Sequence, residues 1–349
     1  MKKYYRKLVL SYSPLKCGYR FEDRFQIIPL DMTDKPKSPY IHHYPLFLEY
    51  TIDFESNEPQ DLLALGTIRF NTEKEILNLL SCLTNHRFFN YDTSMVGWGV
   101  ILPNKSVEEL SLMERDILNR QESNAFMGGY IYSRLKEDLM IERFTENIPA
   151  TIFKEAQMHE YYTDNPIDDY KHEIYFPNTL DSALHFYYGL SPKTRMRVKS
   201  CIYLACDGID VSIQKRTLSF LSYVSALEGL VNLEIDDDEI KFKCGSCKAV
   251  ESSPYTCPKC GKPIWGIKQK FVSFLSKFVA GSEDSKKIYS KIYNLRSRMT
   301  HTSQLFDIDY ELSFDLNNTE EDWLMRLKTL QLFRIALNSW LRYTNKKKK

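Results

Sequence analysis

The sequence predicts an α+β N-terminal domain with much antiparallel sheet at residues 1–175, and an all-α bundle at residues 176–349 with a ribbon inserted at about 241–265. Two observations lead to this fold class. Before residue 175, short segments rich in β-branched and aromatic residues resemble strands. After it, apolar residues recur at helical spacing, and four cysteines interrupt the pattern. A chain of 349 residues, 43% of them hydrophobic, is long enough for two cores and is not largely disordered.

In the N-terminal domain, the elements are expected in the following order. Strands are predicted at residues 5–12, 25–30, 46–54 and 63–70. The segment TEKE at 72–75 has the spacing of a capping box and predicts a helix that reaches about residue 86. A strand at 97–102, a helix at 106–121 and a strand at 130–132 follow. No catalytic motif stands out in this half of the sequence.

The C-terminal domain is predicted as a series of helices. Ser191 precedes Pro192, and a capping residue followed by proline at the first helical position marks a helix start. Apolar stripes one turn apart support the other helices. The expected helices span residues 181–188, 192–206, 214–233, 267–279, 285–299 and 320–343. Together they predict a helical bundle with the cysteine-containing ribbon in one connection.

Four cysteines form two CxxC pairs with nine residues between them: Cys244 with Cys247, and Cys257 with Cys260. Two such knuckles bring four thiolates to one tetrahedral ion, and soft thiolates in that geometry select zinc, with iron as the main competitor. The alternative is two disulfides or four unrelated thiols. Because four protein ligands leave no open position, the one predicted zinc ion is structural rather than catalytic.

The N-terminus and the remaining cysteines bear on the compartment. Only a short apolar run at residues 8–10 follows the basic N-terminus, which is too short for a signal peptide or a membrane span. The other cysteines are scattered, as is typical of free thiols in a reducing compartment. We therefore expect a cytoplasmic protein that does not engage a membrane.

The net charge of +1 conceals a basic segment. Between residues 241 and 301, eleven lysines and two arginines stand against three acidic residues, a formal balance of +10. A zinc ion with four thiolates contributes about −2, so the segment stays basic. A basic segment around a histidine suits a polyanionic partner, although runs of charge are usually solvated faces.

Within this segment, the sequence YNLRSRMTH at 293–301 resembles a motif of the HEPN superfamily, in particular of its Apea-like branch. An aromatic residue and a leucine before Arg296, a polar residue after it and His301 five residues on carry the resemblance. The segment ALEGL at 226–230, on an earlier predicted helix, adds to it. The resemblance covers residues 180–345. The family usually has glycine after the histidine, where this chain has Thr302, and the zinc ribbon is not a general family feature.

The resemblance implies a metal-independent endoribonuclease, a hydrolase that acts on RNA in antiviral defence, as in abortive infection, or in a toxin-like stress response. It also implies a homodimer with a composite site on its two-fold axis. The N-terminal domain would then be a sensor or a regulatory domain. A trigger protein, encoded by a phage or by the same operon, is a further expected partner.

The residue chemistry points the same way. RNA is cleaved by its own 2′-hydroxyl, so the enzyme needs a proton-transfer group near neutral pH and a fixed cation. His301 is the candidate for the first role and Arg296 for the second. Ser297 is expected to bind a phosphate oxygen or to orient the histidine. By resemblance, Glu228 would position Arg296.

Helix geometry adds a condition. At about 100° per residue, Arg296 and His301 are about 140° apart on a regular helix, so they share a face only if the helix ends near residue 299 or 300. A homodimer that brings two such motifs into one cleft is the other way to place an arginine beside a histidine.

An arginine and a histidine at this spacing also occur by chance. The alternative function is a non-catalytic nucleic-acid or protein-binding module that uses the zinc ribbon and the basic segment. Expected additional RNA contacts are Arg298 and Lys291.

Overall fold

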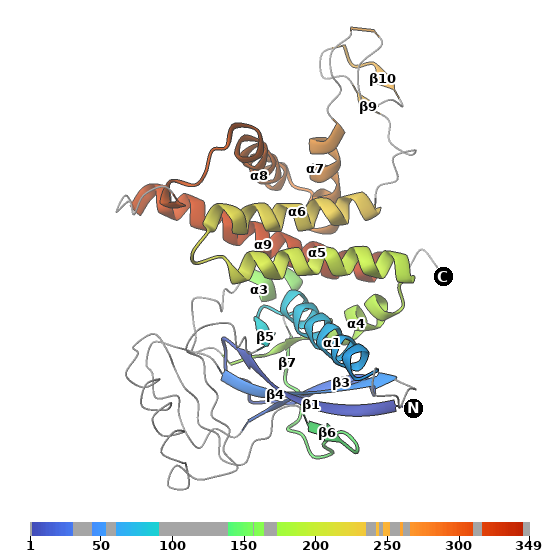
Figure 1. Cartoon of the computed structure of the whole chain (residues 1–349). Coiled ribbons are helices and arrows are strands. Elements are labelled where there is room, and N and C mark those ends of the chain that lie inside the picture. The colour runs from blue at the N-terminus through green and yellow to red at the C-terminus, as the bar shows by residue number, and fades with distance from the viewer. Residues whose placement is uncertain are drawn as a thin grey trace. The chain divides into compact units, whose positions relative to one another are not determined.

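The computed structural model describes residues 2–30, 44–53, 61–90, 139–155, 157–163, 173–234, 242–243, 247–251, 259–260, 266–309 and 316–344. The chain divides into two compact units, one of residues 1–157 and 164–178, the other of residues 158–163 and 179–349 (Figure 1). No helix in the described ranges is both long and apolar enough to cross a bilayer.

The first unit contains an antiparallel sheet, as the sequence predicts. In the described part it has six strands: β1 (Lys2–Ser11), β2 (Tyr19–Phe21), β3 (Phe25–Pro29), β4 (Tyr44–Asp53), β5 (Phe88–Asn90) and β6 (Leu139–Ile141). Their order is β2-β3-β4-β1-β5, and β6 also pairs with β1. β1 pairs with β4 along its whole length, from Lys2 opposite Asp53 to Ser11 opposite Tyr44. A short parallel pair, β7 (Phe153–Lys154) and β8 (Phe176–Pro177), completes the described strands of this unit.

Helix α1 (Asp61–Leu83) corrects two predictions in this unit. The strand expected at residues 63–70 is wrong, because these residues form the first half of α1. The capping box is also wrong: Thr72 lies inside the helix, where its hydroxyl donates to the carbonyl of Ile68 at 2.8 Å. Glu73 is buried instead and binds the Tyr50 hydroxyl and Lys7 Nζ, which fastens α1 to the sheet.

A second buried carboxylate organises the other side of the sheet. Glu49 is fully buried and accepts hydrogen bonds from Arg6 Nε, Gln26 Nε2 and the backbone N–H of Thr145, each at 2.8 Å. A buried carboxylate persists when its oxygens are satisfied in this way. The burial of Glu49 is therefore explained by its hydrogen bonds within the first unit. The expected strands at 97–102 and 130–132 and the expected helix at 106–121 lie outside the described residues.

The second unit is mostly helical, as predicted. Its described helices are α3 (Met158–Thr163), α4 (Leu180–Tyr188), α5 (Pro192–Asp210), α6 (Arg216–Glu234), α7 (Gly266–Phe278), α8 (Glu283–Thr302) and α9 (Leu316–Thr344), with a short 3-10 turn η3 (Asp307–Asp309). Ser191 caps α5 by accepting from the backbone N–H of Thr194 at 3.3 Å, and Pro192 occupies the first helical position, which confirms that start signal.

Helix α6 is the centre of this unit, because it packs against α5, α7, α8 and α9 (Figure 1). It contributes a row of fully buried side chains that includes Phe220, Val224 and Leu227. From α9, Phe333, Leu337 and Trp340 close the core. Between α6 and α7 the described residues include a two-stranded antiparallel pair, β9 (Phe242–Lys243) and β10 (Val250–Glu251).

Candidate functional site

Helix α8 carries the residues that the sequence singles out, and its ends explain their placement. At its start, the Ser282 hydroxyl accepts from the backbone N–H of Ser285 at 3.2 Å, and Glu283 and Asp284 complement the helix dipole. At its end, Ser303 adopts a left-handed conformation with φ of 56°, which stops the helix. The expected end at residue 299 is therefore wrong by three residues, and α8 continues through His301.

One side of α8 faces the core of its unit. Ile292 and Met299 are buried on this side, and Arg296 is half-buried. The Arg296 Nη2 atom donates to Glu228 Oε2 of α6 at 3.1 Å; the two side chains are 27% and 19% exposed. The structure thus brings Arg296 and Glu228 together and links α8 to α6 through a partly buried ion pair.

Burial perturbs the groups around this ion pair. It raises the pKa of Glu228 above that of an ordinary carboxyl, while the charge of Arg296 and its hydrogen bond act in the opposite direction. Burial also raises the pKa of the nearby Tyr293 hydroxyl, whose ring packs against Phe271 of α7 with centroids 5.6 Å apart. Burial therefore outweighs the pairing, and the surroundings disfavour an ionised Glu228 even with Arg296 beside it.

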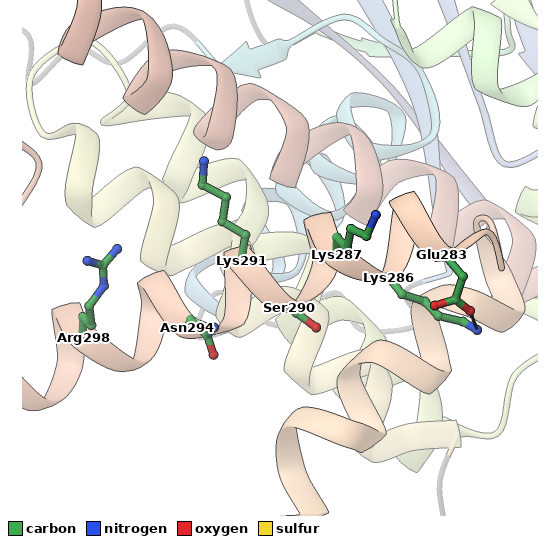
Figure 2. Close-up of a pocket in the computed structure, with 7 residues that line it drawn as sticks. All are labelled: Glu283, Lys286, Lys287, Ser290, Lys291, Asn294 and Arg298. Atoms are coloured by element: carbon green, nitrogen blue, oxygen red, sulfur yellow. Dashed lines mark hydrogen bonds and ion pairs between the residues drawn. The ribbon is translucent and has the colours of Figure 1, made fainter.

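The opposite side of α8 is exposed and basic. Lys291, Arg298 and His301 are exposed there, and Asn294 lies between them. A surface hollow of about 670 Å³ lies along this side, and Figure 2 shows the described residues that line it, all from α8: Glu283, Lys286, Lys287, Ser290, Lys291, Asn294 and Arg298. Lys268 of α7 reaches the same side by donating to Asn294 Oδ1 at 2.9 Å.

The two residues of the Arg-His motif consequently lie on different sides of α8. Because the helix continues through His301, Arg296 and His301 stay about 140° apart in one chain. Arg298, three residues before His301, is only about 60° from it. Within the described part of the chain, neither the imidazole of His301 nor the guanidinium of Arg298 forms a hydrogen bond or an ion pair. Ser297 is half-buried, and its carbonyl accepts from the Thr300 hydroxyl at 3.3 Å.

The segment after His301 is fastened to the start of α6. The Asp309 carboxylate accepts from the backbone N–H groups of Arg216 and Thr217 at 3.0 and 2.6 Å. The Thr217 hydroxyl in turn accepts from the backbone N–H of Phe306 at 2.8 Å. Asp309 is thus a cap of α6 that is supplied by a segment remote in sequence. Sequence reasoning missed Asp309 as a cap and Lys268 and Asn294 as part of the basic side.

The predicted zinc ligands are described only in part. Cys247 is half-buried and Cys260 is exposed; Cys244 and Cys257 lie outside the described residues. Cys247 stands in the turn between β9 and β10, and Lys248 directly after it has a φ of 62°, which fits the tight turn of a metal knuckle. The described residues contain no group of three or more potential metal ligands. The four-cysteine zinc site therefore stays a prediction. The two described thiols, Cys247 and Cys260, are donors that zinc accepts.

Comparison with known proteins gives no matching family model, no matching curated protein and no matching solved structure.

Proposed function

We propose that the second unit is a metal-independent endoribonuclease of the HEPN type that acts in antiphage defence or in a toxin-like stress response. The supporting observation is the placement of His301. It is exposed at the end of a basic helix side, next to Arg298, where an anionic polymer would be held by cations. A histidine in such a place suits proton transfer near neutral pH.

The proposed reaction uses the RNA's own nucleophile. The 2′-hydroxyl oxygen attacks the adjacent phosphorus, and His301 accepts the hydroxyl proton. The bond between phosphorus and the 5′ oxygen then breaks, and the imidazolium returns a proton to that oxygen. The products are a 2′,3′-cyclic phosphate and a 5′-hydroxyl, and a positioned cation lowers the barrier by binding the charge that develops on the phosphate.

We assign that cation to Arg296, and the geometry of α8 then calls for two copies of the chain. Arg296 turns away from His301 of its own chain, but its side chain keeps 27% of its surface exposed. In a homodimer around a two-fold axis, one chain supplies His301 and the other supplies Arg296, which Glu228 holds in place. Mixing His301→Ala with Arg296→Ala protein tests this. We expect the mixture to regain cleavage, and a mixture as inactive as its parts contradicts the composite site.

Cleavage itself is tested with total cellular RNA in EDTA, incubated with wild-type and His301→Ala protein. We expect discrete new RNA ends from the wild type only. His185→Ala is the matched control, because His185 is another exposed helical histidine of the same unit. Equal cleavage by all three proteins would point to a contaminant and would refute the role of His301.

The cysteine ribbon has a structural role in this proposal. Cys244, Cys247, Cys257 and Cys260 would hold one zinc ion, which would order the insertion between α6 and α7 without taking part in cleavage. Two metal-binding readouts test it: zinc content by mass spectrometry, and loss of one equivalent in a Cys247→Ser/Cys260→Ser variant. The first unit would be a sensor or a regulatory domain for a trigger protein.

A second candidate function is a non-catalytic RNA-binding module. The basic side of α8 favours it equally, because binding needs the cations but not proton transfer. His301→Ala separates the two functions: an enzyme loses cleavage and keeps RNA binding, whereas a binding module has no cleavage to lose.

A further inference from the structure

The exposed side of α8 forms a row of cations and hydrogen-bonding groups, here called the cationic face. It consists of Lys287, Lys291, Asn294 and Arg298, which Figure 2 shows, and of the exposed His301 near the end of the helix. We propose that the cationic face binds an unpaired stretch of RNA lengthwise, so that successive phosphates follow α8 toward His301. The choice of RNA over DNA rests on the proposed function; the lengthwise binding of an unpaired strand rests on the structure of α8.

Charge along the cationic face increases toward His301. At the start of the helix, Lys287 is paired with Asp284 at 2.9 Å, so its charge is partly balanced. After Asp284, α8 contains no further acidic residue. Near the middle, Lys268 of α7 adds a cation through its hydrogen bond to Asn294. A polyanion is therefore drawn most strongly to the half of the helix that ends at His301.

The chemistry of the cationic face favours a polynucleotide over a protein partner. The described residues around the hollow are all polar or charged. Protein interfaces depend on apolar or aromatic anchors at their centre, and none of these lining residues is one. Lysine, arginine, serine and asparagine are the side chains that contact phosphate and sugar. Because none of the described lining residues is aromatic, we expect no base stacking on them and little sequence preference.

The dimensions favour an unpaired strand over a duplex. The hollow of about 670 Å³ is an open depression along one side of α8 rather than an enclosed pocket, so it suits a strand laid along its surface. Duplex RNA is recognised across successive grooves, which one straight helix side cannot follow. From Lys287 to His301 the helix rises about 21 Å. At about 3.4 Å per nucleotide of a stacked strand, this corresponds to on the order of six nucleotides.

Binding of non-cleavable RNA to the full chain tests the inference. The probes are fluorescent 2′-O-methyl oligouridylates of two, four, six and twelve nucleotides, followed by anisotropy. We expect affinity to rise steeply up to about six nucleotides and to level off beyond that length. In Lys291→Ala and Arg298→Ala proteins, the negative slope of log K against log salt concentration, where K is the association constant, should become shallower by about 0.7 for each lost phosphate contact. Lys193→Ala, at an exposed lysine of α5, is the matched control and should leave the slope unchanged.

Several results would overturn lengthwise binding of an unpaired strand. They are equal affinity for two and six nucleotides, tighter binding of a duplex of the same length, an unchanged slope in both variants, or displacement by polyglutamate of equal charge as efficient as by RNA. The probes lack a free 2′-hydroxyl, so binding is measured whether or not the chain cleaves RNA. Length-dependent binding without cleavage of natural RNA refutes the ribonuclease alone. Cleavage without length dependence refutes the lengthwise strand alone.

Discussion

The contact between α5 and α6 at Gly229 gives the sharpest prediction about stability. A Cβ atom added at Gly229 would lie 2.5 Å from Cys201 Sγ, closer than side-chain atoms approach. Cys201 is 4% exposed on α5, and burial raises the pKa of its thiol to about 11, so the thiol stays neutral in the core. Gly229 directly follows Glu228, which pairs with Arg296 of α8.

The expected magnitudes follow from two opposing effects. In a helix interior, alanine is normally more stable than glycine by about 1 kcal/mol. Against this, overpacking a closed core costs about 1–3 kcal/mol. Gly229→Ala should therefore lower the free energy of unfolding by about 1 kcal/mol. In a Cys201→Ala background the clash is gone, and the same substitution should raise it by about 1 kcal/mol.

Urea unfolding of the wild type, both single variants and the double variant measures this coupling. Helical circular dichroism follows the unfolding of both units, and tryptophan fluorescence reports on the second unit through the buried Trp340. Gly66→Ala is the matched control, because a Cβ at this α1 glycine has no atom within 4 Å and should simply stabilise. If Gly229→Ala stabilised both backgrounds, or if the two substitutions added within about 0.5 kcal/mol, the close approach of the helices would be refuted.

Three further predictions concern α8 and its contact with α6. Arg296→Ala should lower the free energy of unfolding by about 1–3 kcal/mol, because it leaves Glu228 unpaired, whereas Arg298→Ala should change it by less than about 0.5 kcal/mol. Equal losses of stability for the two variants in thermal unfolding would contradict the assignment of Arg296 and Arg298 to opposite sides of α8. Since burial raises the pKa of Glu228, the folded state binds its proton more tightly than the unfolded state, so the wild type should lose stability relative to Glu228→Gln as pH rises from about 4.3 through the raised pKa. If urea titrations showed the wild type gaining stability relative to Glu228→Gln as the pH rises across that range, the pKa of Glu228 would be lowered rather than raised by folding. Ser303→Val should lower stability by about 1–2 kcal/mol because of its positive φ, while Ser303→Gly should not; equal melting temperatures would speak against the left-handed turn.

Much of the helical unit was predictable because its signals are local. The Ser191 cap and the proline after it mark the start of α5, and apolar stripes support the other predicted helices; the short α3 was not predicted. The strand predicted at 63–70 failed because a short apolar run does not separate a strand from a helix. The remainder of that helix, through residue 83, was assigned correctly; the error lay in placing its start at residue 72.

The sequence singled out the residues of the candidate site, and their arrangement came only from the structure. The family resemblance implied that Glu228 positions Arg296, and the structure places Arg296 Nη2 3.1 Å from Glu228 Oε2. The sequence does not reveal that α8 continues past His301, because the left-handed residue that ends the helix is a serine rather than a glycine. Nor does it reveal the cap from Asp309, which lies 93 positions from Arg216 in sequence. Contacts between remote segments leave no local pattern, and one of them, between Lys268 of α7 and Asn294, adds a cation to the side of α8 that carries His301.

The end groups of RNA incubated with the wild-type protein in EDTA test the central claim most directly. Attack by the 2′-hydroxyl predicts fragments with a 2′,3′-cyclic phosphate at one new end and a 5′-hydroxyl at the other, and no cut at a position where a single 2′-deoxynucleotide replaces the cleaved nucleotide. Ends with a 3′-hydroxyl and a 5′-phosphate, or cleavage that the 2′-deoxy substitution does not affect, would contradict the ribonuclease mechanism assigned to His301.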